Sequence, residues 1–123
     1  MTDPANPDLA RALEAQDAVA VAFALRNGTT TVPALPSAGA PQVRVFRRGD
    51  ADRYMLLLFS SPETYVAMTP EEPEHEVLAY DGSALRDFLA ENIGVLEAVW
   101  FDVAGPHAMQ AAPEDVLEAL SLP

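Results

Sequence analysis

The chain of 123 residues contains no cysteine and no lysine, and each absence limits its chemistry. Without cysteine it can form no disulfide, thiolate metal site or thiol nucleophile. All seven basic residues are arginines, and 19 acidic residues bring the net charge to −12. Because an acidic chain repels phosphate groups, we expect neither nucleic acid nor an anionic membrane surface as a partner.

Long apolar runs are missing as well. No stretch approaches the roughly 18 apolar residues that would indicate a membrane-spanning helix. The opening sequence MTDPANPDLA has neither the basic start nor the apolar core of an export signal. We therefore expect a cytoplasmic protein. Half of the residues are apolar, and the length predicts one packed domain over residues 1–123.

Apolar periodicity and turn residues predict the secondary structure. Strands are expected near residues 29–35, 42–48, 53–60, 76–80 and 97–104, and helices near residues 6–24, 83–92 and 113–120. Together they predict a single α/β (α+β) domain with a mixed, largely antiparallel sheet of about five strands, covered by two to three helices. In the first helix, we expect Leu9, Leu13, Val19 and Phe23 to share one apolar face.

The stretch RYMLLLFSSPETYVAM, residues 53–68, contains an apolar run that ends at two serines and a proline. A strand that is apolar on both faces belongs inside a sheet, so Leu56, Leu58 and Phe59 are predicted core residues. We expect residues 42–48 to pair with it as a hairpin. Ser61 followed by Pro62 is typical of a helix start, with Ser61 as the capping residue.

Five short motifs follow one another in a recognisable order: NPDLARAL, TVPALP, MLLLFSSPETY, LAYDGSAL and WFDVAGP. This order resembles the SseB-like N-terminal domain family, the family of the enhanced serine sensitivity protein, over residues 6–120. In that family one strand ends in Val-Pro, another ends in Phe-Thr-Ser before a glutamate, and a later one ends near Asn-Pro-Gly. Here Ser60 replaces the usual Thr, and Asp102 and Val103 replace Asn-Pro. The resemblance implies a bacterial protein, and no catalytic residue carries over from it.

Our first hypothesis is a non-enzymatic protein-binding or regulatory domain with an unidentified protein partner and no cofactor, because no convergent acid, base and nucleophile are evident. If the strands ending in LLFSSPETY and VWFDVAGP run parallel and adjacent, ligands are expected at their carboxyl ends. The predicted site comprises Ser60, Ser61, Glu63, Tyr65, Asp102 and Gly105. A carboxylate at Asp102 disfavours an anion there and favours a peptide or a neutral polar ligand.

The alternative hypothesis is a small serine-dependent hydrolase that uses Ser60 or Ser61 with His75 or His107. The G-x-S-x-G motif that presents a serine in α/β-hydrolases is missing. The segment EEPEHE places four carboxylates around His75, but its spacing fits no ligand motif, so no metal site is predicted.

Two further features remain open from the sequence. Four of the seven arginines, Arg44, Arg47, Arg48 and Arg53, gather within ten positions. They form an alternative site for a phosphate or an acidic peptide, or else a solvated strand face. Trp100 and Phe101 point to opposite faces of their strand, so one ring could line a surface, although both could pack in the core.

Overall fold

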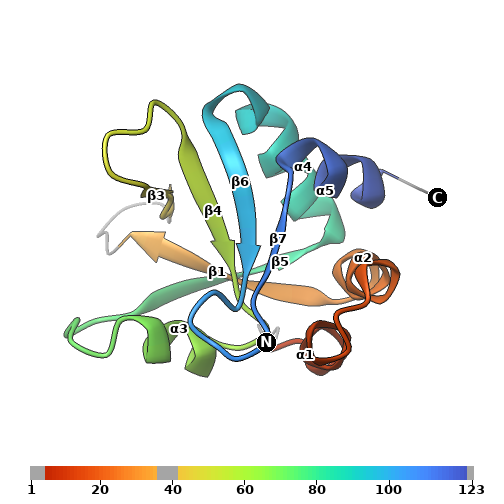
Figure 1. The fold of residues 1–123 in the computed structure, drawn as a ribbon, viewed down its shortest axis with the longest axis horizontal. Helices are drawn as coiled ribbons and strands as arrows, with labels where there is room; N and C mark the ends of the chain where they lie inside the picture. The colour runs from red at the N-terminus through yellow and green to blue at the C-terminus, as the bar shows by residue number, and fades with distance from the viewer. Residues whose placement is uncertain (1–4, 36–41, 122–123) are drawn as a thin grey trace.

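The computed structural model describes residues 5–35 and 42–121, and Figure 1 shows how their helices and strands are arranged. The elements are α1 (Pro7–Glu14), α2 (Ala18–Asn27), β1 (Thr29–Leu35), β2 (Gln42–Val43), β3 (Phe46–Arg47), β4 (Tyr54–Leu58), α3 (Pro62–Met68), β5 (Glu76–Asp81), α4 (Gly82–Asn92), the 3₁₀ helix η1 (Ile93–Val95), β6 (Leu96–Phe101), β7 (Met109–Ala111) and α5 (Pro113–Leu120). The predicted α+β class is confirmed. In this described part, no helix is long and apolar enough to cross a membrane.

The strands form two sheets, where the sequence predicted one. Sheet A has the order β2-β1-β5 and is antiparallel, whereas sheet B has the order β3-β4-β6-β7 and contains the parallel pair β4–β6. Figure 1 shows β1 and β5 running across the direction of β4 and β6. An isolated bridge joins the sheets, through hydrogen bonds of 3.1 and 3.0 Å between the backbones of Thr31 and Phe59.

The division into two sheets begins in the segment that was predicted as one strand over residues 42–48. Its first part, β2, pairs with β1 of sheet A, while its second part, β3, pairs with β4 of sheet B. The predicted hairpin with residues 53–60 is therefore formed by β3 alone. The strand predicted over 97–104 ends at Phe101, and β7 was not predicted.

The helix predicted over residues 6–24 is interrupted. Gln16 has a φ of 53°, in the left-handed region that a helix cannot contain. Asp17 then caps α2, because its carboxylate accepts from the backbone N–H groups of Val19 and Ala20. One predicted helix is thus two helices that pack against each other as a pair.

The interruption also overturns the predicted apolar face of this segment. Leu9 and Leu13 on α1 are fully buried, as expected. Val19 and Phe23 on α2 are instead 79% and 58% exposed. The turn at Gln16 reorients α2, so that Val21 and Leu25 face the core.

The main hydrophobic core lies between sheet B and the helices. Helices α1, α2, α4 and α5, which gather on the right of Figure 1, contribute apolar side chains that pack with Leu56 and Leu58 of β4 and with Phe101 of β6. On the opposite face, Leu57 and Phe59 pack with Tyr65 of α3 in a smaller cluster. The predicted burial of Leu56, Leu58 and Phe59 is confirmed, and β4 lies inside sheet B between β3 and β6.

Truncating Leu56 or Leu58 to Ala should lower the free energy of unfolding by about 2 to 5 kcal/mol, because each change leaves a cavity in the main core. Urea denaturation monitored by circular dichroism measures the loss. Val19→Ala is the control, since its exposed side chain should change stability by less than about 0.5 kcal/mol. Equal unfolding midpoints for all three variants and the parent would contradict this description of the core.

Candidate functional site

The two strand ends predicted to form a site do meet. Strands β4 and β6 are parallel neighbours, and Leu58 pairs with Phe101. Ser60, two residues after Leu58, and Asp102, directly after Phe101, are therefore brought together. The backbone N–H of Ser60 donates to Asp102 Oδ1 at 2.8 Å, and Ser60 Oγ donates to Asp102 Oδ2 at 2.7 Å. The predicted site required these two strands to be parallel and adjacent, and they are.

This Ser60–Asp102 pair is closed to ligands. The two residues are only 5% and 8% exposed, and the Asp102 carboxylate also lies 3.3 Å from the Thr64 hydroxyl. Asp102 has a φ of 45°, a left-handed conformation that Asp tolerates better than most residues. Its backbone N–H donates to the Leu58 carbonyl at 3.0 Å. Because both carboxylate oxygens accept hydrogen bonds within the fold, the pair holds the end of β4 and the first turn of α3 to the end of β6.

The other residues of the predicted site have separate local roles. Ser61 caps α3, and its Oγ accepts from the Thr64 N–H at 3.4 Å, so the predicted cap is confirmed. Glu63 is exposed, whereas Tyr65 is 1% exposed and packs in the smaller core cluster. Gly105 closes the turn after β6 by donating to the Asp102 carbonyl at 2.9 Å. The structure joins the two strand ends, and the Ser60–Asp102 pair lies buried between them, whereas Glu63 is exposed nearby.

The two histidines lie elsewhere. His75 Nε2 is 2.7 Å from the carbonyl oxygen and 2.8 Å from the hydroxyl of Thr69. His107 is exposed on the turn after β6. Within residues 5–35 and 42–121, no hydrogen bond connects Ser60 or Ser61 to either histidine. Nor do three or more Asp, Glu or His side chains of these ranges converge as metal ligands would.

The four clustered arginines divide between two surfaces. Arg44 forms a bidentate ion pair with Glu72, at 2.8 and 2.9 Å, and donates to the Tyr65 hydroxyl at 2.9 Å. Its guanidinium also lies 4.7 Å from the centre of the Phe46 ring. The hydrogen bonds from Arg44 lower the pKa of Glu72 below its ordinary value. Arg44 therefore connects the loop after α3 to the start of β3.

Arg47, Arg48 and Arg53 lie along the edge of sheet B. Arg48 pairs with Glu97 of β6 at 3.1 Å, and Arg53 donates to the Leu96 carbonyl at 3.5 Å. Arg47 is exposed beside Arg48. Arg47 and Arg48, but not Arg53, line a surface hollow, which makes part of the predicted basic segment relevant to binding.

The hollow occupies the face of sheet B that the four large helices leave uncovered, and we call it the sheet hollow. It measures about 670 Å³, within the roughly 300–1,000 Å³ of ligand-binding pockets. Its apolar lining comes from β3, β4, β6, the turn after β6 and α3, and it includes Phe46, Met55, Leu57, Met68, Trp100 and Val103. Trp100 is half-buried there, while Phe101 is buried on the opposite face, so one of the two rings lines a surface as the alternation allowed.

A β-bulge places a carboxylate in the sheet hollow. Tyr54 pairs with Leu96 and Met55 pairs with Ala98, so Glu97 is an extra residue on β6. The bulge turns Glu97 to the same face as Ala98, and both line the hollow. Glu97 Oε2 accepts from Arg48, whereas Oε1 is buried and has no hydrogen-bond partner among the described residues.

Most of this hollow was not predicted from the sequence. The run MLLLF is apolar throughout, so both faces of β4 were predicted to be core, and the run gives no sign that Met55 and Leu57 face a hollow. Glu97 stands alone in the apolar stretch LEAVWF, and an acidic residue in a central strand is the one signal that could have drawn attention to it. The bulge itself leaves no mark in the sequence.

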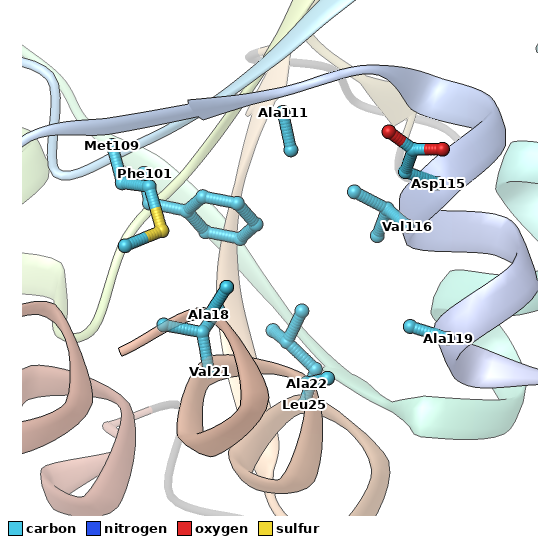
Figure 2. A pocket seen from close by; sticks show the side chains of 10 residues that line it. All are labelled: Ala18, Val21, Ala22, Leu25, Phe101, Met109, Ala111, Asp115, Val116 and Ala119. Carbon is cyan, nitrogen blue, oxygen red and sulfur yellow. The ribbon is translucent and has the colours of Figure 1, made fainter. Parts of the chain in front are cut away.

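A second, smaller cleft lies between α2 and α5 (Figure 2). It measures about 220 Å³ and is walled by apolar side chains, with Phe101 and Met109 on one side and alanines of both helices on the other. Asp115 is the one charged residue of its lining and lies at the edge in Figure 2. With a single polar side chain, the cleft lacks the converging polar groups that orient a ligand.

Comparison of the chain with models of known protein families and with curated protein sequences gave no match. The resemblance to the SseB-like family therefore stays a prediction, and the site is interpreted from its own geometry.

Replacing Asp102 with Ala should lower the free energy of unfolding by about 2 to 4 kcal/mol, because it leaves the buried N–H and hydroxyl of Ser60 without their charged acceptor. Chemical denaturation measures the change. Asp50→Ala removes the same charge from an exposed turn and should have little effect. If both variants unfold at the parent's denaturant concentration, the Ser60–Asp102 pair does not hold the strand ends together.

The Arg44–Glu72 ion pair predicts a pH dependence. Because Arg44 lowers the pKa of Glu72 in the folded state, the pair stabilises the fold above the pKa of the unfolded carboxyl, about 4.3. This stabilisation should disappear as the pH falls through the lower folded pKa. Melting temperatures of the parent and Glu72→Gln should differ at pH 6, and the difference should shrink as the pH falls below the unfolded pKa of about 4.3, whereas Glu74→Gln, from the same loop, should follow the parent throughout. A parent–variant difference that persists unchanged at pH 3 would contradict the prediction.

Proposed function

We propose that this chain is a non-enzymatic protein-binding domain of the SseB-like kind, and that the sheet hollow receives a segment of its protein partner. One observation carries the proposal: an inner sheet face with two aromatic rings and two methionines is left open beside arginines. Aromatic residues, Met and Arg are the types enriched at protein interfaces. Met is also adaptable in shape, which suits a surface that accepts another chain.

Charge supports a protein partner over a nucleic acid. The net charge of −12 repels a phosphate backbone over the whole molecule, and two arginines at one hollow are a small counterweight. At physiological salt, charges farther apart than about 8 Å are largely screened, so a short segment in the hollow responds mainly to Arg47, Arg48 and Glu97. These three side chains supply both signs of charge at the rim.

The arrangement of the serines supports binding in preference to hydrolysis. Ser60 Oγ already donates to Asp102, and Ser61 Oγ caps α3, so each hydroxyl has a structural role. We extend the proposal to a cytoplasmic location, because a chain without cysteine needs no oxidising compartment to fold.

Selection from a peptide library displayed on phage, with the full chain as bait, tests this function. We expect the selected peptides to change the fluorescence of Trp100, which is the chain's single tryptophan. Their affinity should fall at least about tenfold in Met55→Glu, because the change puts a charge into the apolar lining.

Phe23→Ser is the matched control, since Phe23 is an exposed ring on α2 and does not line the sheet hollow. Thermal melts of both variants establish that they fold. Peptides that bind Met55→Glu as well as the parent, or that lose affinity only for Phe23→Ser, would place the binding surface elsewhere and overturn the proposal.

A further inference from the structure

Strand β5 forms one edge of sheet A. It pairs with β1 through six residue pairs in continuous register, whereas β2 lies on the other side of β1. Figure 1 shows β5 running beside β1. Within residues 5–35 and 42–121, no further strand pairs with β5. An edge strand presents backbone N–H and C=O groups that can pair with a strand of another chain.

The hydrogen bonds of β1 identify which backbone groups of β5 point outward. Thr31 bonds to sheet B through the isolated bridge, and the Pro33 carbonyl accepts from the Arg44 N–H, so Thr31 and Pro33 point away from β5. Opposite residues of an antiparallel pair alternate between hydrogen-bonded and non-hydrogen-bonded positions. Ala79 lies opposite Thr31, and Val77 lies opposite Pro33. Val77 and Ala79 therefore direct their N–H and C=O groups to the outer edge of β5.

These outward groups can be reached by another chain. In the part of the chain that the structure describes, no hydrogen bond to them is formed from outside sheet A. Ala79 is exposed and its side chain is small, so a second backbone can approach to the usual strand spacing of about 4.8 Å. The side chains of Leu78 and Tyr80 pack against the main core and hold β5 in place. The edge is thus formed before any partner arrives.

Carboxylates stand at both ends of this edge. Glu74 and Glu76 precede Val77, Asp81 lies two residues after Ala79, and all three acidic residues are exposed. None of the three forms an ion pair with another described residue. A strand added to the edge would lie about 4.8 Å away, well within the roughly 8 Å over which charges act at physiological salt. Basic side chains at the two ends of an added segment would therefore be attracted.

The charge of the chain disfavours a second copy as the added strand. Each copy carries a net charge of −12 and the same carboxylates beside its own β5. Two such edges would repel each other, whereas a basic segment of another protein would not.

We propose that the outer edge of β5 binds an extended segment of a partner protein, which has basic residues at both ends and adds a fourth strand to sheet A. Binding of this kind takes its affinity from main-chain hydrogen bonds, here to Val77 and Ala79. The edge belongs to sheet A and the sheet hollow to sheet B, so this inference does not rest on the proposed function.

Hydrogen exchange in the ¹⁵N-labelled full chain tests the geometry of the edge. We expect the amides of Leu78 and Tyr80, which point to β1, to exchange slowly with solvent, and those of Val77 and Ala79 to exchange rapidly. NMR measures all four rates. Equal protection of all four amides would show that the edge is already covered. Protection of Val77 and Ala79 that grows with protein concentration would show pairing between two copies. Either result would overturn the proposal.

Three synthetic peptides test binding to the edge. The first, acetyl-Lys-Thr-Val-Val-Thr-Lys-amide, favours an extended conformation and is basic at both ends. The second has glutamate in place of both lysines. The third carries N-methyl groups on both valines, which block hydrogen bonding along either side of the peptide. We expect the first peptide to bind at least about tenfold more tightly than the other two. At ten times its Kd, it should slow the exchange of the Val77 and Ala79 amides about tenfold.

Variants of the chain assign the binding to β5. Ala79→Pro removes an outward N–H that does not bond to β1, so the variant should fold and lose at least about tenfold in affinity for the first peptide. Replacing both Glu74 and Glu76 with Gln should weaken binding at least about threefold. The matched replacement of Glu114 and Glu118, which are exposed on α5, should leave the affinity unchanged. Thermal melts establish that the variants fold, and the N-methylated peptide remains decisive if Ala79→Pro does not.

Each contrary result identifies the part of the proposal that fails. Equal binding of the first peptide and its N-methylated form would overturn the added strand. Equal binding of the lysine and glutamate peptides would overturn the basic partner. If no peptide slows the exchange of Val77 or Ala79, the edge is not a binding surface. The sheet hollow is tested separately through Met55→Glu, so it could still bind its own ligand in that case.

Discussion

The parallel pairing of β4 with β6 is the constraint on which the other features of the molecule depend. It requires a crossover connection, which α3, β5 and α4 provide between the two strands. It also brings the carboxyl ends of both strands to one edge, where Ser60 meets Asp102. Had the strands been antiparallel, these residues would lie at opposite ends of the sheet. The hydrogen bonds between Ser60 and Asp102 therefore depend on the parallel order of β4 and β6.

The same pairing separates the two faces of sheet B. Alternation along β4 directs Leu56 and Leu58 to the helices and Met55 and Leu57 to the hollow. A regular β6 would direct Glu97 away from the face that carries Ala98 and Trp100. The bulge at Glu97 breaks the alternation and adds one carboxylate to an otherwise apolar sheet face. The otherwise apolar face thereby carries one carboxylate, which pairs with Arg48.

Local signals in the sequence predicted the elements whose causes are local. Ser61 caps α3 because a hydroxyl before proline and an acidic first turn favour a helix start in any context. The burial of Leu58 follows from a continuous apolar run. In contrast, the helix break at Gln16 has no strong sequence signal, since neither Gly nor Pro marks it, and the following Asp17 gains its capping role only once the chain has turned.

Features that depend on distant pairing could not be predicted from the sequence. Residues 42–48 are divided between two sheets because β2 pairs with β1 and β3 pairs with β4, and both partner strands lie outside this segment. The meeting of the two strand ends was predicted from the sequence. The hydrogen bonds by which Ser60 and Asp102 hold those ends together were not. Conversely, the sheet hollow arises where a face predicted to be core is not covered by the four large helices, and α3 contributes only Met68 to its lining.

The bridge between Thr31 and Phe59 has a consequence for cooperativity. Val32 of β1 belongs to the same core cluster as Leu56 and Leu58, so sheet A shares both backbone hydrogen bonds and apolar contacts with sheet B. Separating the sheets would expose this shared core to water. We therefore expect that neither sheet unfolds while the other keeps its full stability, so that the described chain melts as one unit. Leu57 connects the sheet hollow to sheet A in the same way, because Val77 of β5 packs against the cluster of Leu57, Phe59 and Tyr65.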